Sequence, residues 1–451
     1  MSLRTQFHYV PRYECNLPSF DGHNAAYIRS RTPAQDPTEY VYALRSGAFR
    51  RTDILDAARR LYPGFRATVN AGGWGGEAVE ADALGRLYTL VEIRLGGGIL
   101  RNLLIYSVDA GRTWRALSLP YAPPQLSPDG RNDGTSASEH LVGWDQRAEP
   151  PLIAVWRPVA DWPGYRACRM ALYVIQPHFE GDRLVLSPGV LVSDRALGMI
   201  QAAGGGSFAT TVGTTTYIVW TEVAAPGSPG APTFVAAFDQ TTGTLGAPLQ
   251  VATARPINDD HTTPGIVSDG QGNLHVVTGS HNSSFMYTHT LDPADPATWS
   301  KPEPVLSAGY KKPGTGSDGR GCQTYVSLVC TPDNALVLAF RQWRMGVDPD
   351  FRGLPYQALS VQRLDPGGAW SDAQRIVYSN NRGYAQYYQK LTIDRHGRLY
   401  LSLNYFRPHD YPRNERVQNR YHHRMVLISE DGGASWRFAT LADFLGGVQP
   451  E

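Results

Sequence analysis

The chain of 451 residues is rich in glycine, proline and aromatic residues, and only 18% of it is charged. Its 42 basic and 41 acidic residues leave a formal net charge of +1, which provides no general attraction for nucleic acid or an anionic membrane. Neither partner is therefore expected, and the composition favours many short β-strands and turns over helices.

Two features of the sequence argue against further classes of protein. No apolar run reaches membrane-spanning length, and the opening "MSLRTQFHYV" lacks the apolar core of a signal peptide. The cysteines Cys15, Cys168, Cys322 and Cys330 form no C-x-x-C pair, which argues against a zinc ribbon or a dithiol redox site. Cys322 and Cys330 are eight residues apart, so a disulfide across a hairpin or two buried thiols would fit.

A repeat of about sixty residues organises the chain. Stretches that combine a turn with alternating apolar residues, the pattern of a strand with one buried face, recur at steps of 57 to 66 residues. They centre on Leu87, Ile153, Tyr217, Leu274, Leu336 and Leu399. One step back lies "GHNAAYIRSRT", and "HRMVLISEDGGASWR" supplies strands to finish a ring. The repeat predicts an all-β, seven-bladed β-propeller that fills residues 1–451 as a single domain.

Two short motifs support this architecture. "YSVDAGRTW" around Asp109 matches the Asp-box pattern S-x-D-x-G-x-T-W, and "ISEDGGASW" around Asp431 matches it with serine in place of threonine. In such a hairpin the carboxylate accepts turn amides, glycine takes a positive φ and tryptophan packs between sheets. We therefore interpret both aspartates as structural.

The repeat also predicts which side chains meet at one end of the propeller. His261, Tyr325 and Tyr387 follow one another at 64 and 62 residues, and His281 and Arg341 are 60 residues apart. Equivalent positions in successive blades surround the same end of the channel. We therefore expect one arc of His261, Tyr325 and a tyrosine of "NRGYAQYYQK", beside a second arc of His281 and Arg341.

These residue types match the needs of β-elimination on a uronic acid. Arginine or a protonated histidine can stabilise the charge that develops on the carboxylate when the C5 proton leaves. A tyrosine or histidine within hydrogen-bonding reach can remove that proton and protonate the leaving oxygen. No cofactor is required by this chemistry.

The segments "DDHTTPGIVSDGQGNLHVVTGSHNSSFMYTHTLDPADPATW" and "GCQTYVSLVCTPDNALVLAFRQW" resemble the repeat region of seven-bladed ulvan lyases and related rhamnose-releasing propeller enzymes. The resemblance implies that His261 and Tyr325 are the acid and base, in an order left open, and that His281 and Arg341 bind the uronate carboxylate. A later tyrosine of the family pattern falls on Tyr384, Tyr387 or Tyr388. It also implies a secreted or periplasmic enzyme acting on an anionic, rhamnose-containing glycan, and we expect a monomer.

The same resemblance implies an alternative site. His23 lies in a Gly-His-Asn turn, "FDGHNAAYIRS", where the rhamnose-releasing relatives look similar. In this alternative His23 is the catalytic residue on the opposite propeller face, and the His261 arc is inherited scaffold. The reaction is then release of rhamnose from a rhamnosyl-glucuronate end, by hydrolysis or exo-elimination.

Other polar clusters have plainer interpretations. Arg407 and His409 lie in a basic insertion that is either a solvated loop or a rim contacting an anionic glycan, and Trp74 is available to stack on a sugar. His422 and His423 are adjacent in a strand and face opposite ways, and Asp259 or Asp260 is expected to cap a turn. No metal ligand is assigned, although a structural calcium or zinc ion stays open.

Two further functional classes compete with the lyase. A sialidase shares the Asp-boxes, but "RSGAFRRTD" does not match the Phe-Arg-Ile-Pro start that such an enzyme needs. A non-catalytic propeller that binds a glycan or a protein predicts that His261 and Tyr325 do not converge, or that the channel mouth is plugged.

Overall fold

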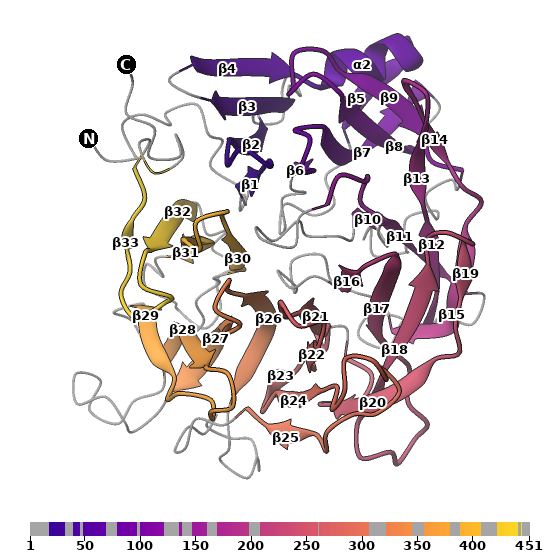
Figure 1. Cartoon of the computed structure of the whole chain (residues 1–451). Helices are drawn as coiled ribbons and strands as arrows, with labels where there is room; N and C mark the ends of the chain where they lie inside the picture. Colours follow the sequence, from indigo (N-terminus) through magenta and orange to yellow (C-terminus); the bar gives the residue numbers. More distant parts are fainter. Residues whose placement is uncertain are drawn as a thin grey trace, which may run out of the picture.

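The structure is a computed structural model, and it describes residues 18–31, 39–45, 48–68, 79–96, 100–120, 135–137, 147–159, 169–197, 208–259, 261–305, 322–344, 356–378, 388–406, 422–440 and 443. Within these residues the strands form seven sheets of four or five strands and one separate two-stranded hairpin. The sheets are arranged in a ring, and the strands nearest its centre are β1, β6, β10, β16, β21, β26 and β30 (Figure 1). The predicted all-β propeller is confirmed.

The first three sheets follow the chain in order and are antiparallel throughout. The first contains β1 (Ser19–Phe20), β2 (Ala26–Arg31), β3 (Glu39–Arg45) and β4 (Ala48–Asp53). The second contains β5 (Phe65–Thr68), β6 (Glu80–Ala81), β7 (Leu87–Leu95), β8 (Leu100–Ser107) and β9 (Arg115–Ser118). The third contains β10 (Thr135–Ala137), β11 (Ile153–Pro158), β12 (Arg169–Ile175) and β15 (Val190–Leu197).

The remaining four sheets repeat this arrangement with one exchange. The fourth contains β16 (Ala209–Val212), β17 (Thr215–Thr221), β18 (Ala231–Asp239), β19 (Thr244–Leu245) and β20 (Leu249–Ala254). The fifth contains β21 (Gly265–Ser268), β22 (Leu274–Val277), β24 (Met286–His289) and β25 (Glu303–Pro304). The sixth contains β23 (His281–Ser283), β26 (Gln323–Cys330), β27 (Leu336–Arg344), β28 (Tyr356–Leu364) and β29 (Gln374–Tyr378). The seventh contains β30 (Lys390–Ile393), β31 (Leu399–Phe406), β32 (His422–Ser429) and β33 (Arg437–Phe438). Strand β23 thus lies between β22 and β24 of the fifth sheet along the chain, but it pairs with β26 of the sixth sheet.

The stretches identified from the repeat form, in each sheet, the strand paired with the innermost one: β2, β7, β11, β17, β22, β27 and β31. Consecutive apolar residues of these strands point toward the two neighbouring sheets in turn, so both faces are buried and not the one face that the sequence pattern predicts. On β27, Leu338 and Phe340 pack with the fifth sheet, whereas Val337 and Ala339 pack with the seventh. The core is therefore a series of apolar layers between sheets, as expected when each repeat buries its faces against its neighbours.

Both Asp-boxes have the predicted structural role. Asp109 accepts hydrogen bonds from the Thr113 backbone amide and hydroxyl at 2.8 and 2.7 Å, and Gly111 has φ +79°. Trp114 is buried in a cluster shared by the first and second sheets. The second box, around Asp431, repeats the contacts with Ser435.

A second aspartate repeat holds the turn between the first two strands of four sheets. In each turn one carboxylate oxygen accepts the backbone N–H groups two and four residues later, as in an Asx-turn. The other oxygen contacts a tyrosine hydroxyl or a histidine six residues later in the following strand. The four aspartates are Asp21, Asp82, Asp269 and Asp394.

The first and seventh sheets meet where the ring closes. Asn24 donates from its side-chain nitrogen to Asp394 at 3.2 Å, and its side-chain oxygen accepts the Arg395 backbone N–H at 2.9 Å. Phe20, Ala26 and Ile28 pack with Tyr400 and Ile428 of the seventh sheet. Within the described residues these two sheets share no strand, so side chains join them.

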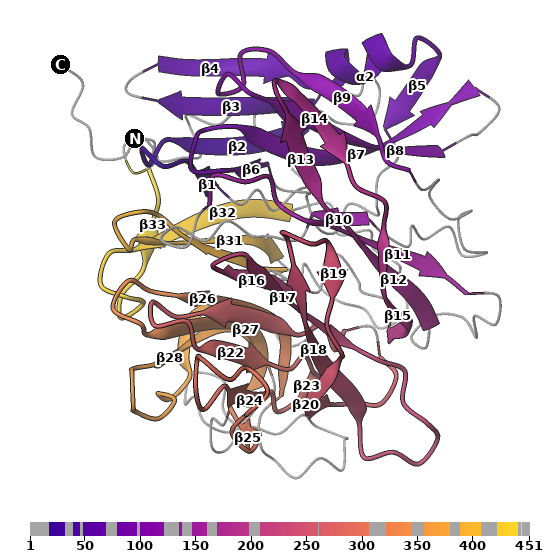
Figure 2. The same ribbon diagram turned by 45° about the vertical axis from the view of Figure 1, so that its right-hand side comes forward.

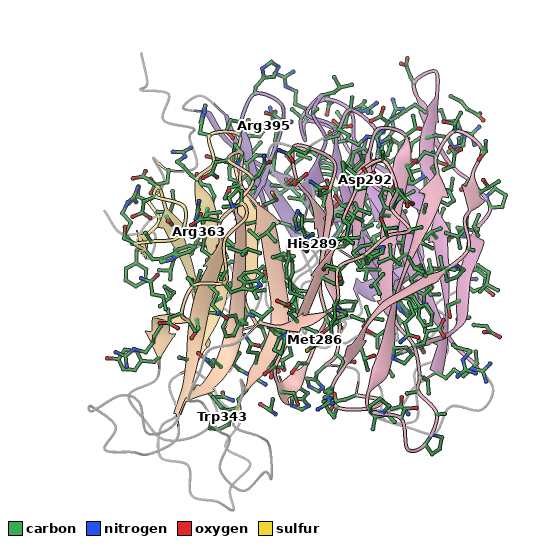
Figure 3. The ribbon with its side chains drawn as sticks, turned by 60° about the horizontal axis from the view of Figure 1, so that its bottom comes forward. Met286, His289, Asp292, Trp343, Arg363 and Arg395 are labelled. Atoms are coloured by element: carbon green, nitrogen blue, oxygen red, sulfur yellow. The ribbon has the colours of Figure 1, made fainter. Side chains whose placement is uncertain are left out.

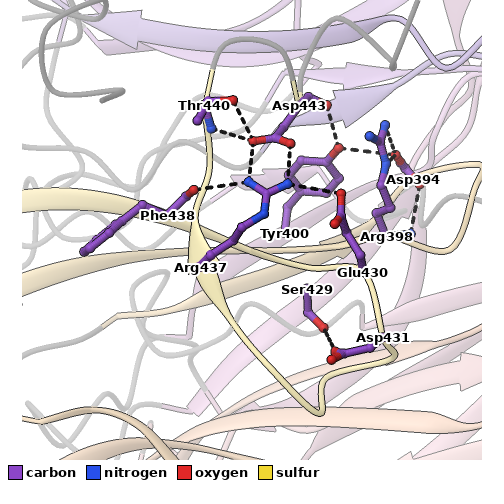
Figure 4. Close-up of polar contacts among 10 residues, drawn as sticks. All are labelled: Asp394, Arg398, Tyr400, Ser429, Glu430, Asp431, Arg437, Phe438, Thr440 and Asp443. Atoms are coloured by element: carbon purple, nitrogen blue, oxygen red, sulfur yellow. Dashed lines mark hydrogen bonds and ion pairs between the residues drawn. The ribbon is translucent and has the colours of Figure 1, made fainter. Parts of the chain in front are cut away.

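The end of the described chain is fixed by a polar network. Arg437 forms an ion pair with Asp443 at 2.7 Å and another with Glu430 at 3.1 Å (Figure 4). The Tyr400 hydroxyl donates to the Asp443 backbone carbonyl and also contacts Asp394. The network therefore ties the segment after β33 to the turn beside the ring closure.

Two smaller elements cover the outer edge (Figure 2). The short helix α2 (Leu55–Leu61) packs Leu55 and Ala58 into the cluster of the first two sheets. The hairpin of β13 (Pro177–Glu180) and β14 (Arg183–Leu186) packs Phe179 and Leu184 against the second sheet. Among the described residues, no helix is long and apolar enough to cross a membrane.

Candidate functional site

The loop before β21 positions Asp259 and His261. Asn258 has φ +51°, and its side-chain amide both donates to the backbone carbonyl of Ala224 and accepts its N–H, at 3.0 and 2.7 Å. Asp259 then accepts the His261 backbone N–H at 3.0 Å. The loop is thus anchored to the fourth sheet while its side chains reach the fifth and sixth, and Asp259 caps the turn as predicted.

The exchange of β23 between sheets positions His281. His281 is paired with Thr324 at the start of β26, and its backbone N–H donates to the Arg255 carbonyl at 3.1 Å. The Asn282 N–H donates to the Thr324 hydroxyl at 3.1 Å. His281 therefore lies between two strands of the fifth sheet along the chain but is held on the sixth, and its partner Thr324 directly precedes Tyr325.

One carboxylate joins the two histidines. The Nδ1 atoms of His261 and His281 lie 2.6 and 2.7 Å from the two oxygens of Asp259, and the imidazole rings stack at 4.0 Å between centroids with an interplanar angle of 17°. Burial opposes ionisation of Asp259, but the contacts with both histidines outweigh it and hold its pKa well below the usual range. Asp259 is therefore an ionised acceptor beneath both rings.

His281 lies in a dry and cationic setting. Burial is the main cause that lowers the pKa of His281 below its usual value, and the neighbouring His261 and Arg341 act in the same direction against Asp259. Its side chain is 17% exposed. The structure thus favours a neutral imidazole at His281.

Tyr325 has an unusual backbone. Its φ is +68°, a left-handed conformation that bulky residues rarely adopt, and the β26–β27 register shifts between Thr324 and Ser327. This bulge places the Tyr325 ring 5.8 Å from the His261 ring. One repeat later Tyr388 also has a positive φ, of +36°, and its ring lies 5.2 Å from that of Tyr325. Gln389 donates to the Tyr325 carbonyl at 2.6 Å and fixes the bulge to the seventh sheet.

Arg341 completes the cluster. It is paired with Thr324 across β26 and β27, is only 2% exposed, and places its guanidinium 4.4 Å from the centroid of the Tyr325 ring. At this depth a cation over an aromatic face contributes about 2 kcal/mol. The sixth sheet thus carries a buried positive charge against the tyrosine.

The structure therefore brings His261, His281, Tyr325 and Arg341 into one cluster rather than two neighbouring arcs. Of the three candidate tyrosines, Tyr388 contacts this cluster. Tyr384, Tyr387 and Arg407 lie outside the described residues, as do Trp74, His409 and Asp260.

His23 lies at the other end of the propeller. It is an exposed residue in the turn between β1 and β2, where Asp21 and Asn24 contact the Arg395 turn of the seventh sheet. Arg341 lies near the end of β27, two residues before Trp343. Figure 3 shows Trp343 and Arg395 at opposite ends of the molecule. His23 thus shares no site with His261.

Asp259, His261 and His281 are also the one group of candidate metal ligands found among the described residues. Their facing atoms are 2.6 and 2.7 Å apart, which is hydrogen-bond spacing. Two ligands of a tetrahedral zinc ion with bonds near 2.1 Å are separated by roughly 3.4 Å. The cluster fits a hydrogen-bonded carboxylate better than an ion. Elsewhere, His275 is a strand histidine whose ring contacts the Tyr287 hydroxyl at 2.8 Å.

Sequence reasoning missed the bridging role of Asp259. The "DDH" motif identified a turn cap, but the contact of Asp259 with His281, 22 positions later, depends on the strand exchange of β23. The two left-handed tyrosines also gave no signal, because neither glycine nor asparagine marks them.

Comparisons with known proteins agree with the fold. Residues 235–441, somewhat less than half of the chain, match the model of a BNR repeat-containing family member. No curated protein sequence matches this chain. A lectin from Burkholderia pseudomallei is similar over 95% of this chain and 98% of its own, with 13% identity and a TM-score of 0.51.

Two other solved structures are more distant. An ulvan lyase bound to -[GlcA(1-4)Rha3S]- has 15% identity and a TM-score of 0.38 over 52% of this chain and 53% of its own, so the chain spans about half the length of that lyase. A Trypanosoma rangeli sialidase in complex with sialic acid has 11% identity and a TM-score of 0.42 over 94% and 60%. The chain is a β-propeller whose residues 235–441 match a BNR repeat model, and the lectin shares this fold over nearly its whole length.

Proposed function

We propose that the Asp259 cluster is the active site of a polysaccharide lyase-like enzyme, which cleaves a glycan beside a uronic acid, with rhamnose–glucuronate as the expected linkage. The observation that supports this most is the meeting of two histidines, a tyrosine and a buried arginine at one end of the propeller. A glycan lyase needs these groups together: a cation for the carboxylate, a base for C5 and an acid for the leaving oxygen.

In the proposed reaction Arg341, with His281, holds the uronate carboxylate and stabilises the charge that develops on it. One of His261 and Tyr325 removes the C5 proton, and the electron pair of the broken C5–H bond forms the C4–C5 double bond. The C4–O bond breaks, and the other group protonates the leaving oxygen. Burial of Arg341 and Tyr325 excludes water, which strengthens the electrostatic part of this catalysis.

We extend the proposal to the whole chain. Each of the seven sheets is one blade of a single domain over residues 1–451, and the protein acts as a secreted or periplasmic monomer on an anionic polysaccharide or oligosaccharide. Tyr384, Tyr387 and Arg407 remain candidates for contacts with this glycan. The reaction needs no cofactor, and a calcium or zinc ion, if one is bound, has a structural role.

Two alternatives each rest on an observation. His23 is exposed at the opposite end in a turn fixed by Asp21, which suits a rhamnose-releasing hydrolase or exo-lyase on rhamnosyl-glucuronate. The match to a lectin over nearly the whole chain supports a non-catalytic propeller that binds a glycan or a protein.

One assay separates the three proposals. Ulvan, gum arabic and a rhamnosyl-glucuronate are incubated with the protein and a chelator, and the ultraviolet absorbance of the 4,5-unsaturated uronate is followed together with free rhamnose. We expect absorbance to rise, to fall by a factor on the order of 10² or more in His261→Ala and Tyr325→Phe, and to persist in His23→Ala. Rhamnose release without absorbance, abolished by His23→Ala, would replace elimination by hydrolysis. Binding without either product would leave a lectin-like propeller.

A further inference from the structure

The geometry points to Asp259 as a positioning residue that holds both His261 and His281 in the same tautomer. The proton of each neutral ring is then on Nδ1, and its Nε2 lone pair is directed away from the carboxylate. This inference rests on the proposed function for its catalytic consequence, but its structural part is independent of any substrate.

The first step concerns hydrogen-bond donors and acceptors. An ionised carboxylate has only acceptor sites, and the pKa of Asp259 lies well below its usual range. Both Nδ1 atoms are within hydrogen-bonding distance of it, on different oxygens. Each ring must therefore donate through Nδ1–H, because a lone pair there would face a negative oxygen.

The second step concerns the opposite edge of the rings. Because the rings are nearly parallel and their Nδ1 atoms meet one carboxylate, their Nε2 atoms lie together on the far side. His261 thus presents a proton acceptor beside Tyr325, which is 5.8 Å away between ring centroids. Arg341 acts on His281 electrostatically. The Nε2 of His281, which carries no proton without substrate, must take up a proton before it can donate to the uronate carboxylate.

The third step concerns what else could orient the rings. His281 is held through its backbone by Arg255 and Thr324, and His261 by the Asp259 turn. These contacts fix the positions of the two residues but not which ring nitrogen carries the proton. Asp259 is the anionic acceptor that both rings share, one on each carboxylate oxygen.

The test compares Asp259→Asn with Asp269→Asn. Asparagine offers one acceptor and one donor, so only one histidine can still donate to it, and the other ring must change tautomer. Asp269 is a matched control because it also caps a turn through two backbone amides and contacts a histidine, His275, at 3.5 Å. It is outside the cluster.

Nitrogen NMR of the histidine-labelled full chain, without substrate, gives the primary readout. We expect His261 and His281 to show protonated Nδ1 and unprotonated Nε2 in the wild type and in Asp269→Asn, and at least one of them to change in Asp259→Asn. Wild-type tautomers retained in Asp259→Asn, or Nε2–H in the wild type, would overturn the inference. A zinc-bound signature on adding Zn²⁺, with loss of the Nδ1–H signals, would also overturn it.

Kinetics on the uronate substrate give the second readout. Asp259→Asn is expected to lower kcat by about 10- to 100-fold with a smaller change in KM and an altered pH profile, whereas Asp269→Asn keeps the wild-type profile. If the two variants unfold at the same temperature, the lower kcat of Asp259→Asn reflects the positioning of the histidines and not a loss of folded protein. If the wild type has no lyase activity, the proposed function fails while the NMR result still decides the tautomers.

Discussion

At the scale of single residues, the candidate site is where the backbone departs from ordinary geometry. A left-handed tyrosine costs on the order of 1–3 kcal/mol, and such strain persists only where surrounding contacts impose it. Here Gln389 holds the Tyr325 carbonyl, and Arg341 and Tyr388 hold its ring. The bulge aims a side chain of the sixth sheet at a histidine of the preceding loop, which a regular strand would not do.

Arg341 provides the sharpest test at this scale. Lysine keeps the positive charge but loses the planar guanidinium that lies over Tyr325 and can pair with both oxygens of a carboxylate. We expect Arg341→Lys to raise KM for a uronate substrate by about tenfold, with a smaller fall in kcat. Arg363→Lys is the control, because Arg363 lies on the same sheet but pairs with Asp333 and Asp365. Equal kinetics in both variants would contradict a role for Arg341 in carboxylate binding.

At the scale of elements, the Asp-box hairpins stabilise the fold without taking part in chemistry. Hydrogen bonds from Ser435 lower the pKa of Asp431 to about 2, so its contribution to stability is fully present above the unfolded value near 4 and is lost as pH falls toward 2. In Asp431→Asn this part of the acid dependence should vanish, so wild type and variant should converge only as the pH approaches 2.

Urea unfolding midpoints measured between pH 6 and 2 check this expectation. Lyase activity near neutral pH should be unchanged in Asp431→Asn, because the box lies on an outer hairpin of the seventh sheet. A difference in stability that stays constant across this pH range would show that the carboxylate acts through something other than its charge.

The strands were predictable from sequence, but the contacts between sheets were not. The apolar runs around Leu87 and Leu336 mark strands because a turn precedes each and the residues of each bury themselves within adjoining sheets. His261 and Tyr325 are one repeat apart, and this spacing indicated that both lie at the same end of the ring. The stacking of His261 on His281 needed the exchange of β23, and the choice of Tyr388 needed the seventh sheet in place. Neither of these two contacts leaves a pattern in the sequence around the residues that make it.

At the scale of the whole molecule, the ring closes through side chains. Asn24 and Asn334 occupy equivalent left-handed turns, with φ +61° and +63°, and each side-chain oxygen accepts a backbone N–H from the preceding sheet's turn. Asn24 has the additional contact with Asp394 and lies at the junction of the first and seventh sheets. Loss of the Asn24 side chain therefore weakens the junction at which the two ends of the described chain meet.

We therefore expect Asn24→Ala to lower the free energy of unfolding by about 1–3 kcal/mol, from one unsatisfied buried group and an unfavourable φ. Asn24→Gly removes the strain of the positive φ and should therefore recover part of the lost free energy of unfolding. Hydrogen exchange should accelerate in the first and seventh sheets together. Asn334→Ala is the matched variant inside the ring, and faster exchange of the same two sheets there would argue against a special role for the closure.

The division of the candidate site among sheets has a consequence for how such a protein can arise. Propellers grow by duplication of a repeat, and a copied repeat would bring a histidine loop, a β-bulge or an arginine strand, but never all three in contact. The Asp259 cluster draws on three consecutive sheets and on a strand that crosses between two of them. Its heritable unit is therefore the block from Asp259 to Gln389, and shuffling of single repeats would preserve the ring while erasing the chemistry.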